Sequence, residues 1–211
     1  MAAPVSQRVD GDRLWRRLRD LARFGATRGG GVCRLALSPE EIGARAALVA
    51  WAREIGLQPS VDAAANLFLT LEGREPQLPP LLIGSHIDTQ PSGGKYDGAY
   101  GVLAALEAAQ AITEHPLRPR RSIAVVAWMN EEGSRFAPGM MGSAVFTGKR
   151  RLADILAIRD RSGCTVEAAL ASVLAAEREL MRRPLGFPVA GFLEAHIEQG
   201  VGLQELSLIH I

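Results

Sequence analysis

Histidine and carboxylate side chains gather in three short segments of this 211-residue chain, and each segment directly follows an apolar run of strand length. Each segment also contains glycine, which lets the backbone turn sharply after a strand. Imidazole nitrogens and carboxylate oxygens are the side-chain atoms that bind divalent transition metals in proteins. The sequence therefore predicts a metal centre assembled from three loops. Its candidate residues, in chain order, are His86, Asp88, Asp97, Glu131, Glu132 and His196.

The first segment offers a ligand and a partner for it. His86 and Asp88 are two residues apart, so both side chains can point the same way from an extended backbone. A carboxylate in that position can hold the ring nitrogen that does not bind metal. Asp97 precedes Gly98 and a helical pattern, so it is either the cap of that helix or a carboxylate that bridges two cations. Both roles can hold at once.

The second and third segments complete the candidate set. Adjacent glutamates such as Glu131 and Glu132 are often only a solvated pair. After a buried strand, however, one glutamate can bind metal while the other takes a proton from a metal-activated water. His196, by itself, is equally a core residue or a ligand, and its place in a third such segment favours the ligand. This donor set is compatible with zinc, manganese, cobalt or nickel.

The apolar runs that precede these segments predict how the side chains meet. Residues 80–83, 122–128 and 189–193 are continuous apolar runs, which is typical of strands covered on both faces in a parallel sheet. In open α/β sheets the ligand site lies beyond the carboxyl ends of the strands. We therefore expect the three loops to converge at one edge of one sheet.

The remaining pattern alternates helices with strands, which indicates an α/β fold with a mainly parallel sheet. A proline after Ser38 and a glutamate three residues on form a capping box at the start of one helix. Residues 142–148 are expected to be irregular or a strand. The other expected elements are helices over 9–24, 38–55, 98–112 and 165–181, and a strand over 66–71.

Bulk composition excludes several classes of partner. The chain is 47% hydrophobic and 22% charged, with a formal net charge of +1, so neither nucleic acid nor a membrane surface is an expected partner. Cys33 and Cys164 are far apart and belong to no metal-binding pair, so we expect reduced thiols in a cytoplasmic protein. No signal peptide or membrane-spanning run is apparent.

Five motifs follow one another along the chain. They are Gly-Ser-His-Ile-Asp-Thr (84–89), Gly-Gly-Lys-Tyr-Asp-Gly-Ala-Tyr-Gly-Val-Leu (93–103), Asn-Glu-Glu-Gly-Ser-Arg-Phe (130–136), Met-Met-Gly-Ser (140–143) and His-Ile-Glu-Gln-Gly (196–200). In this order they resemble the amidase/hydantoinase/carbamoylase family, which includes N-carbamoyl-L-amino-acid hydrolases and allantoate amidohydrolases. This family is a branch of the dinuclear-metal aminoacylase–carboxypeptidase superfamily, and the resemblance covers nearly the whole chain.

The resemblance implies a role for each candidate residue. His86 and His196 would bind one metal ion, Glu132 would bind a second, and Asp97 would bridge the two. Glu131 would act as general base and then general acid, Asp88 would orient His86, and Gln199 would contact the substrate. The implied cofactors are two divalent ions, zinc or manganese. The implied reaction is hydrolysis of a linear C–N bond in a small ureido or N-carbamoyl substrate.

The resemblance also sets expectations for the fold and the extent of the chain. It implies a three-layer α/β/α, zinc-peptidase-like catalytic domain that is incomplete here. Family members are about twice as long, with an inserted lid and dimerisation domain and a last catalytic segment. We therefore expect residues 1–205 to be the N-terminal part of the catalytic domain and residues 206–211 to be a non-native tail. The full-length protein would be a homodimer, and this chain alone would be inactive.

Two other readings stay open. An aminoacylase or metallopeptidase of the same superfamily would use the same metal ligands on a different bond. A non-catalytic metal-binding fragment is the second alternative, although the unligated Glu131 disfavours it, because a purely structural site needs no base.

Overall fold

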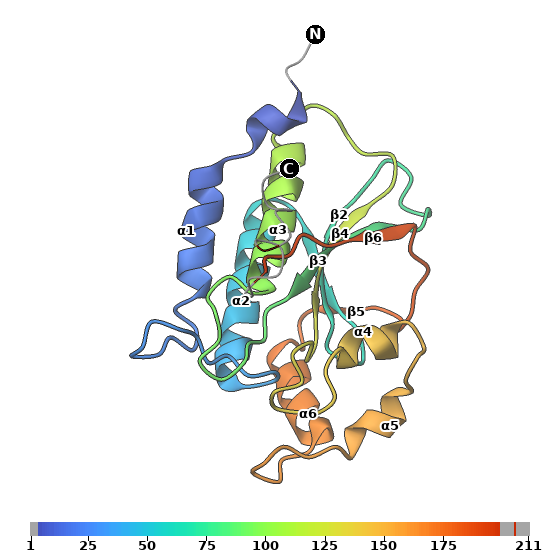
Figure 1. Ribbon diagram of the computed structural model, residues 1–211. Coiled ribbons are helices and arrows are strands. Elements are labelled where there is room, and N and C mark those ends of the chain that lie inside the picture. Colours follow the sequence, from blue (N-terminus) through green and yellow to red (C-terminus); the bar gives the residue numbers. More distant parts are fainter. Residues whose placement is uncertain (1–3, 199–204, 206–211) are drawn as a thin grey trace.

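The computed structural model of the chain describes residues 4–198 and 205 (Figure 1). The Asp10 side chain caps the helix that begins at Gly11. The predicted cap at Ser38 is confirmed, since its hydroxyl accepts from the Glu41 amide at the start of the helix that begins at Pro39. The helices are η1 (Val5–Arg8), α1 (Gly11–Leu21), α2 (Pro39–Glu54), α3 (Ala99–Thr113), α4 (Met141–Phe146), α5 (Leu152–Leu156) and α6 (Val166–Ala176). The strands are β1 (Gln58–Val61), β2 (Leu67–Leu71), β3 (Leu81–His86), β4 (Ile123–Trp128), β5 (Met181–Arg182) and β6 (Gly191–Leu193).

The described strands form one sheet in the order β5-β1-β2-β4-β3-β6. β4, β3 and β6 are parallel neighbours, and β5 is parallel to β1. β2 runs antiparallel to both β1 and β4. Its reversal relative to β1 follows from the connection between them, because five residues are too few for a crossover between parallel strands. The sheet is therefore mixed, and its parallel part is the part that carries the candidate loops.

Helices cover both faces of the sheet, as the α/β expectation requires. Figure 1 shows α1, α2 and α3 together on one side of the sheet, where they bury most of the core. The other side carries a smaller cluster, to which α4 contributes an aromatic ring. Its members are Phe68, Leu82, Ala124, Val126, Trp128 and Phe146, with Phe187 packed against them. The second layer is thus thinner than the first.

Two local predictions were wrong. Residues 142–148 are not irregular or extended, because Met141, Val145 and Phe146 are buried at helical spacing in α4. The helix expected over 165–181 ends at Ala176, and Met181 already belongs to β5. No sequence pattern indicated β1, whose Pro59 disfavours a strand and whose pairing with β2 is a tertiary contact.

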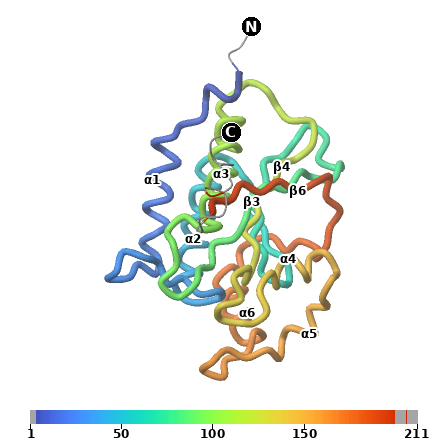
Figure 2. Tube along the Cα trace, viewed as in Figure 1, coloured from blue at the N-terminus to red at the C-terminus, as the bar shows by residue number. Residues whose placement is uncertain are grey.

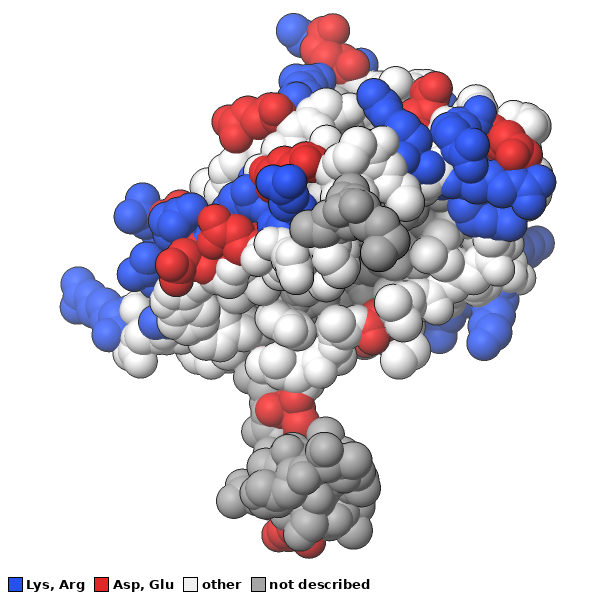
Figure 3. Space-filling model, turned by 90° about the horizontal axis from the view of Figure 1, so that it is seen from above, with Lys and Arg blue, Asp and Glu red and all other residues white. Residues whose placement is uncertain are grey.

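The surface agrees with the composition. Figure 3 shows positive and negative side chains interspersed over the face that it presents, with both signs often adjacent. None of the helices in the described part of the chain combines the length and the apolar character that crossing a bilayer requires. Cys33 and Cys164 are both free.

Candidate metal centre

The candidate loops leave the sheet side by side. β3 and β4 pair in parallel over their whole length, from Leu81 opposite Ile123 to His86 opposite Trp128. β6 lies along the other edge of β3, and Figure 2 shows the chain continuing from β6 towards α3. All three strands therefore deliver their following loops to the same end of the sheet, as the sequence predicted.

His86 is buried in the floor of the site, with 1% of its surface exposed. Its Nδ1 lies 3.0 Å from the backbone carbonyl of Asp88, and a carbonyl can only accept, so Nδ1 carries the hydrogen. In the neutral ring Nε2 is then the atom with a lone pair, and it lies 3.5 Å from a Glu131 oxygen and 4.0 Å from an Asp97 oxygen. This is the tautomer and direction that a metal-binding histidine requires.

His196 reaches the same point from the third loop. Its Nδ1 lies 2.6 Å from the carbonyl of Ile197, and its Nε2 lies 3.3 Å from Asp97 Oδ1. The two imidazole rings stack with centroids 5.7 Å apart. One ligand atom each from His86, Asp97 and His196 falls within 4.8 Å of the others, so these three residues could hold one ion.

Gly98 permits this close approach. Its φ is +60°, and a Cβ at this position would lie 2.4 Å from Nε2 of His86. The cap position of α3 is Gly98 itself, which has no side chain, so the expectation that Asp97 is the cap residue of this helix is wrong. The Asp97 carboxylate lies instead between the two histidines.

Asp88 joins the first loop to the second. One of its carboxylate oxygens accepts from the Glu131 amide and the other from the Glu132 amide, both at 3.1 Å. Its Oδ1 also lies 3.5 Å from Nδ1 of His86. Asp88 is 1% exposed, so these contacts form in the interior and fix both glutamates relative to the histidine.

The two glutamates differ in their surroundings. Glu132 Oε2 accepts a 2.6 Å hydrogen bond from Gln90, whereas Glu132 Oε1 is buried without a hydrogen-bond partner among the described residues. Glu131 directs Oε2 towards His86. Burial raises the pKa of the Glu131 carboxyl, and the negative charges of Asp88 and Glu194 act in the same direction. Burial likewise raises the pKa of Glu132, and Asp97 adds to the shift.

These surroundings fit a divalent cation. A buried carboxylate oxygen without a partner is costly unless a cation or a donor satisfies it. Burial alone would lower the pKa of His86, but the carboxylates of Asp88 and Glu131 raise it to about 9. The carboxylates around His86 therefore give the site an excess of negative charge, which a divalent cation would neutralise. Mixed imidazole and carboxylate donors suit zinc and manganese.

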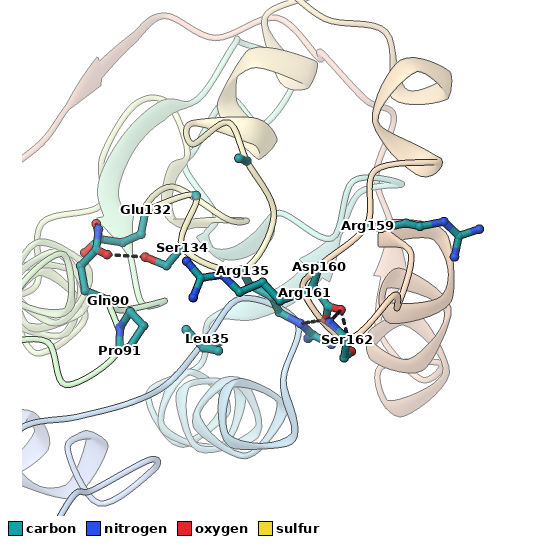
Figure 4. Close-up of a pocket in the computed structure, with 12 residues that line it drawn as sticks. Leu35, Gln90, Pro91, Glu132, Ser134, Arg135, Arg159, Asp160, Arg161 and Ser162 are labelled. Carbon is teal, nitrogen blue, oxygen red and sulfur yellow. Dashed lines mark hydrogen bonds and ion pairs between the residues drawn. The ribbon is translucent and has the colours of Figure 1, made fainter.

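A cavity of about 900 Å³ opens beside Glu132 (Figure 4). Gln90, Ser134 and Arg135 line it together with a turn at residues 159–162. Arg135 is fixed at the wall, because its guanidinium donates to Asp160 at 3.0 Å and to the Ala36 carbonyl at 2.8 Å. The cavity is large enough for a small organic substrate next to the metal centre.

Sequence reasoning missed some residues of this site. Gln90 directly follows the motif at 84–89, and Ser134 lies within the motif at 130–136, but neither received a role, and only their polar side chains in loops rich in glycine could have drawn attention to them. Gln199, expected to contact the substrate, lies outside the described residues. The individual roles expected for the other residues stay predictions.

Known proteins resemble the chain in sequence and in fold. An N-carbamoyl-L-amino-acid amidohydrolase from Rhizobium meliloti is 39% identical over 202 residues, which are 95% of this chain and 48% of that protein. An allantoate amidohydrolase from Bacillus subtilis is 36% identical over 184 residues, 87% of this chain and 44% of that protein. The chain spans about half the length of the curated relatives it matches.

A solved structure supports the same relationship. A hydantoinase/carbamoylase family amidase from Burkholderia ambifaria superposes with a TM-score of 0.87 at 47% identity, covering 94% of this chain and 48% of that one. The resemblance to the amidase/hydantoinase/carbamoylase family is thereby confirmed. The protein-family model for peptidase family M28 matches residues 66–183, which include the first and the second candidate loops. The chain therefore belongs to peptidase family M28.

Proposed function

We propose that this chain carries the metal centre of an amidohydrolase that cleaves a linear C–N bond in a small ureido or N-carbamoyl compound. The observation that carries the proposal is the meeting of His86, Asp97 and His196 within ligand distance, with the unpartnered Oε1 of Glu132 on the adjoining loop. The names of the relatives support the substrate class, because they include N-carbamoyl-L-amino-acid amidohydrolases, an allantoate amidohydrolase and a ureidoglycolate hydrolase from Arabidopsis thaliana.

The donor geometry supports the first part of the proposed ligand set, and the family resemblance suggests the second part. His86, His196 and Asp97 would hold one divalent ion, and Asp97 and Glu132 would hold a second, with zinc or manganese as the candidates. Two such ions supply activation of water and polarisation of the scissile carbonyl. Asp88 would keep the two glutamates and His86 in register through its paired contacts to the loop amides.

Glu131 would move the proton. Its raised pKa brings the carboxyl closer to neutral pH, where a general base can take a proton from the attacking water and return it to the leaving nitrogen. Its Oε2 lies 3.5 Å from the metal-facing nitrogen of His86, so it is adjacent to the reacting position. The cavity beside Glu132 would receive the remainder of the substrate.

The proposal extends to three properties of the full-length protein: a substrate contact, its oligomeric state and its location. Gln199 would contact the substrate, the full-length protein would be a homodimer, and its location would be cytoplasmic, which the two free cysteines support. Because the chain spans about half the length of its relatives, we expect the 211 residues alone to turn substrate over far more slowly than a full-length relative.

The test combines metal binding with hydrolysis. We expect the dialysed chain to retain divalent metal by elemental analysis, Glu132→Ala to lose much of it, and Glu131→Gln to keep it. In a full-length relative assayed in parallel, the substitution equivalent to Glu131→Gln should abolish release of ammonia from N-carbamoyl amino acids or allantoate. A wild-type chain that retains no metal would contradict the proposed centre.

Peptide hydrolysis is the second candidate, and the match to peptidase family M28 favours it. The same metal centre can serve either bond, because the ions and the base act on a carbonyl carbon in both cases. Including N-acetyl amino acids and dipeptides in the substrate panel separates the two. Faster hydrolysis of those compounds than of any ureido compound would assign the centre to acylated amines or peptides.

A further inference from the structure

Gln90 and Ser134 connect two loops around one oxygen of Glu132. Gln90 Nε2 donates to Glu132 Oε2 at 2.6 Å, and the Ser134 hydroxyl donates to Gln90 Oε1. Figure 4 shows the three side chains close together at one side of the cavity. Gln90 belongs to the loop after β3, whereas Glu132 and Ser134 belong to the loop after β4.

The hydrogen-bond chain has only one sensible direction. A glutamate carboxylate accepts and cannot donate, so the amide must present its NH₂ group to Glu132. The amide oxygen then faces Ser134, whose hydroxyl can donate to it. The backbone of Gln90 is also fixed, because its carbonyl accepts from the Gly93 amide at 3.0 Å and from the Thr89 hydroxyl at 2.9 Å.

The hydrogen bond from Gln90 to Oε2 also determines the position of the other carboxylate oxygen of Glu132, Oε1. With Oε2 occupied by Gln90, the carboxylate is held in one rotation, and Oε1 is the atom left buried without a partner among the described residues. A carboxylate presented in this way offers a single oxygen to a cation. A freely rotating carboxylate would lose conformational entropy on binding the ion.

We propose that Gln90 is a positioning residue that holds Glu132 with Oε1 directed at the metal centre, and that Ser134 fixes the orientation of the Gln90 amide. This inference rests on the proposed metal centre. It assigns Glu132 as a ligand through one oxygen, with its second oxygen reserved for Gln90. A competing arrangement is that Glu132 releases Gln90 and binds the ion through both oxygens, in which case Gln90 opposes binding.

The experiment measures Mn²⁺ affinity of the 211-residue chain from the electron paramagnetic resonance signal of free Mn²⁺, together with urea unfolding of the metal-free chain. Gln90→Met removes the hydrogen bond at similar size, and Gln90 is exposed, so the fold should tolerate the change. Gln110→Met is the matched control, because Gln110 is another glutamine whose amide donates to a glutamate, here Glu114 at 2.8 Å. Gln110 lies in the last turn of α3, whereas the candidate site adjoins Gly98 at the start of that helix.

We expect Gln90→Met to weaken the Mn²⁺ site that contains Glu132 by about 10- to 100-fold, the range typical of residues that orient a metal ligand. Ser134→Ala should weaken it less, and the double variant should bind no more weakly than Gln90→Met, since both act through one contact. Gln110→Met should leave affinity unchanged. The unfolding midpoint of Gln90→Met should match that of the wild type, which separates positioning from a structural role.

Unchanged or tighter Mn²⁺ binding by Gln90→Met would overturn the inference, and tighter binding would assign Glu132 both oxygens on the ion. Additive losses in the double variant would overturn the role of Ser134. A wild-type chain without Mn²⁺ affinity is a different result, because it would remove the proposed metal centre itself.

Discussion

At the scale of single residues, the site is built by fixing one atom with a contact to its neighbour. Nδ1 of His86 lies against the Asp88 carbonyl, which leaves Nε2 towards Asp97 and Glu131, and Oε2 of Glu132 accepts from Gln90, which leaves Oε1 without a partner among the described residues. In the proposed metal centre each of these residues would therefore have one satisfied polar atom and one available to an ion. Such preorganisation lowers the entropy that metal binding must overcome.

The contact between Gly98 and His86 makes a prediction at this scale. In Gly98→Ala the new Cβ would meet the imidazole at 2.4 Å, so the ring must move. The control is Gly148→Ala, because Gly148 also has positive φ (+73°), but a Cβ there would meet no non-neighbouring atom within 4 Å. We expect Gly98→Ala to be less stable than the control by about 1–3 kcal/mol in urea unfolding, as for other overpacked sites. Equal losses would show that only backbone strain matters.

At the scale of elements, patterns that depend on near neighbours in sequence were predictable, and those that depend on distant contacts were not. The Ser38 cap and the apolar runs that became β3 and β4 were both read from adjacent residues. β1 was not, because its four residues do not alternate between buried and exposed, and pairing with β2 and β5 is what makes them a strand.

The residues of the candidate site likewise divide into those that the sequence could predict and those that it could not. His86, Asp97 and His196 could be grouped beforehand, because His86 and Asp97 belong to the end of one strand and its loop, His196 to the loop after another, and parallel strands end together. The part played by Gln90 could not, since a hydrogen bond to Glu132 across 42 residues leaves no trace in the spacing of either motif. The α4 helix was missed because it has only six residues and one of them, Gly142, disfavours a helix.

The start of α2 provides a pH prediction. Burial raises the pKa of Glu41 to about 7 from an ordinary value of 4.5, although Arg45 and the Leu37 amide act against the shift. Between these two values the folded chain keeps a proton that the unfolded chain has released, so the free energy of unfolding falls as pH rises. The full effect is at most about 3 kcal/mol.

Glu41→Gln should remove this pH dependence. The variant should gain stability relative to the wild type as the pH is raised from 4.5 to 7, as measured by urea unfolding of the metal-free proteins. Glu40→Gln serves as the control, because Glu40 is the exposed neighbour on the same turn. A stability difference for Glu41→Gln that stays constant with pH would contradict the assignment of the proton to Glu41.

At the scale of the whole molecule, the sheet ends on the β6 side in an apolar edge. Phe192 and Leu193 are 46% and 65% exposed, and Val189 before them is 37% exposed. β6 pairs with β3 on one side and with no other strand of the described chain on the other. An uncovered strand edge with apolar side chains is a template for association between molecules.

We therefore expect this chain to associate as its concentration rises, and Leu193→Lys to reduce the association. The charge would interrupt both the apolar surface and the pairing of edges. Light scattering after size-exclusion chromatography measures the mean mass. Leu117→Lys is the comparison, because Leu117 is 54% exposed but lies in the connection between α3 and β4. If the two substitutions lower the mass equally, general solubility rather than the β6 edge is responsible.

Because β6 is short and the proposed ligand His196 follows it, metal binding would be coupled to local unfolding of this strand. Only three residues pair with β3, yet the segment directly after them carries His196. A three-residue edge strand opens at low free-energy cost, so the amides of residues 191–193 should exchange with solvent faster than those of β3. An ion shared by His86 and His196 would clasp the two strands together. Hydrogen exchange at β6 would then slow in proportion to metal occupancy, so that the ion orders the very strand that supplies its ligand.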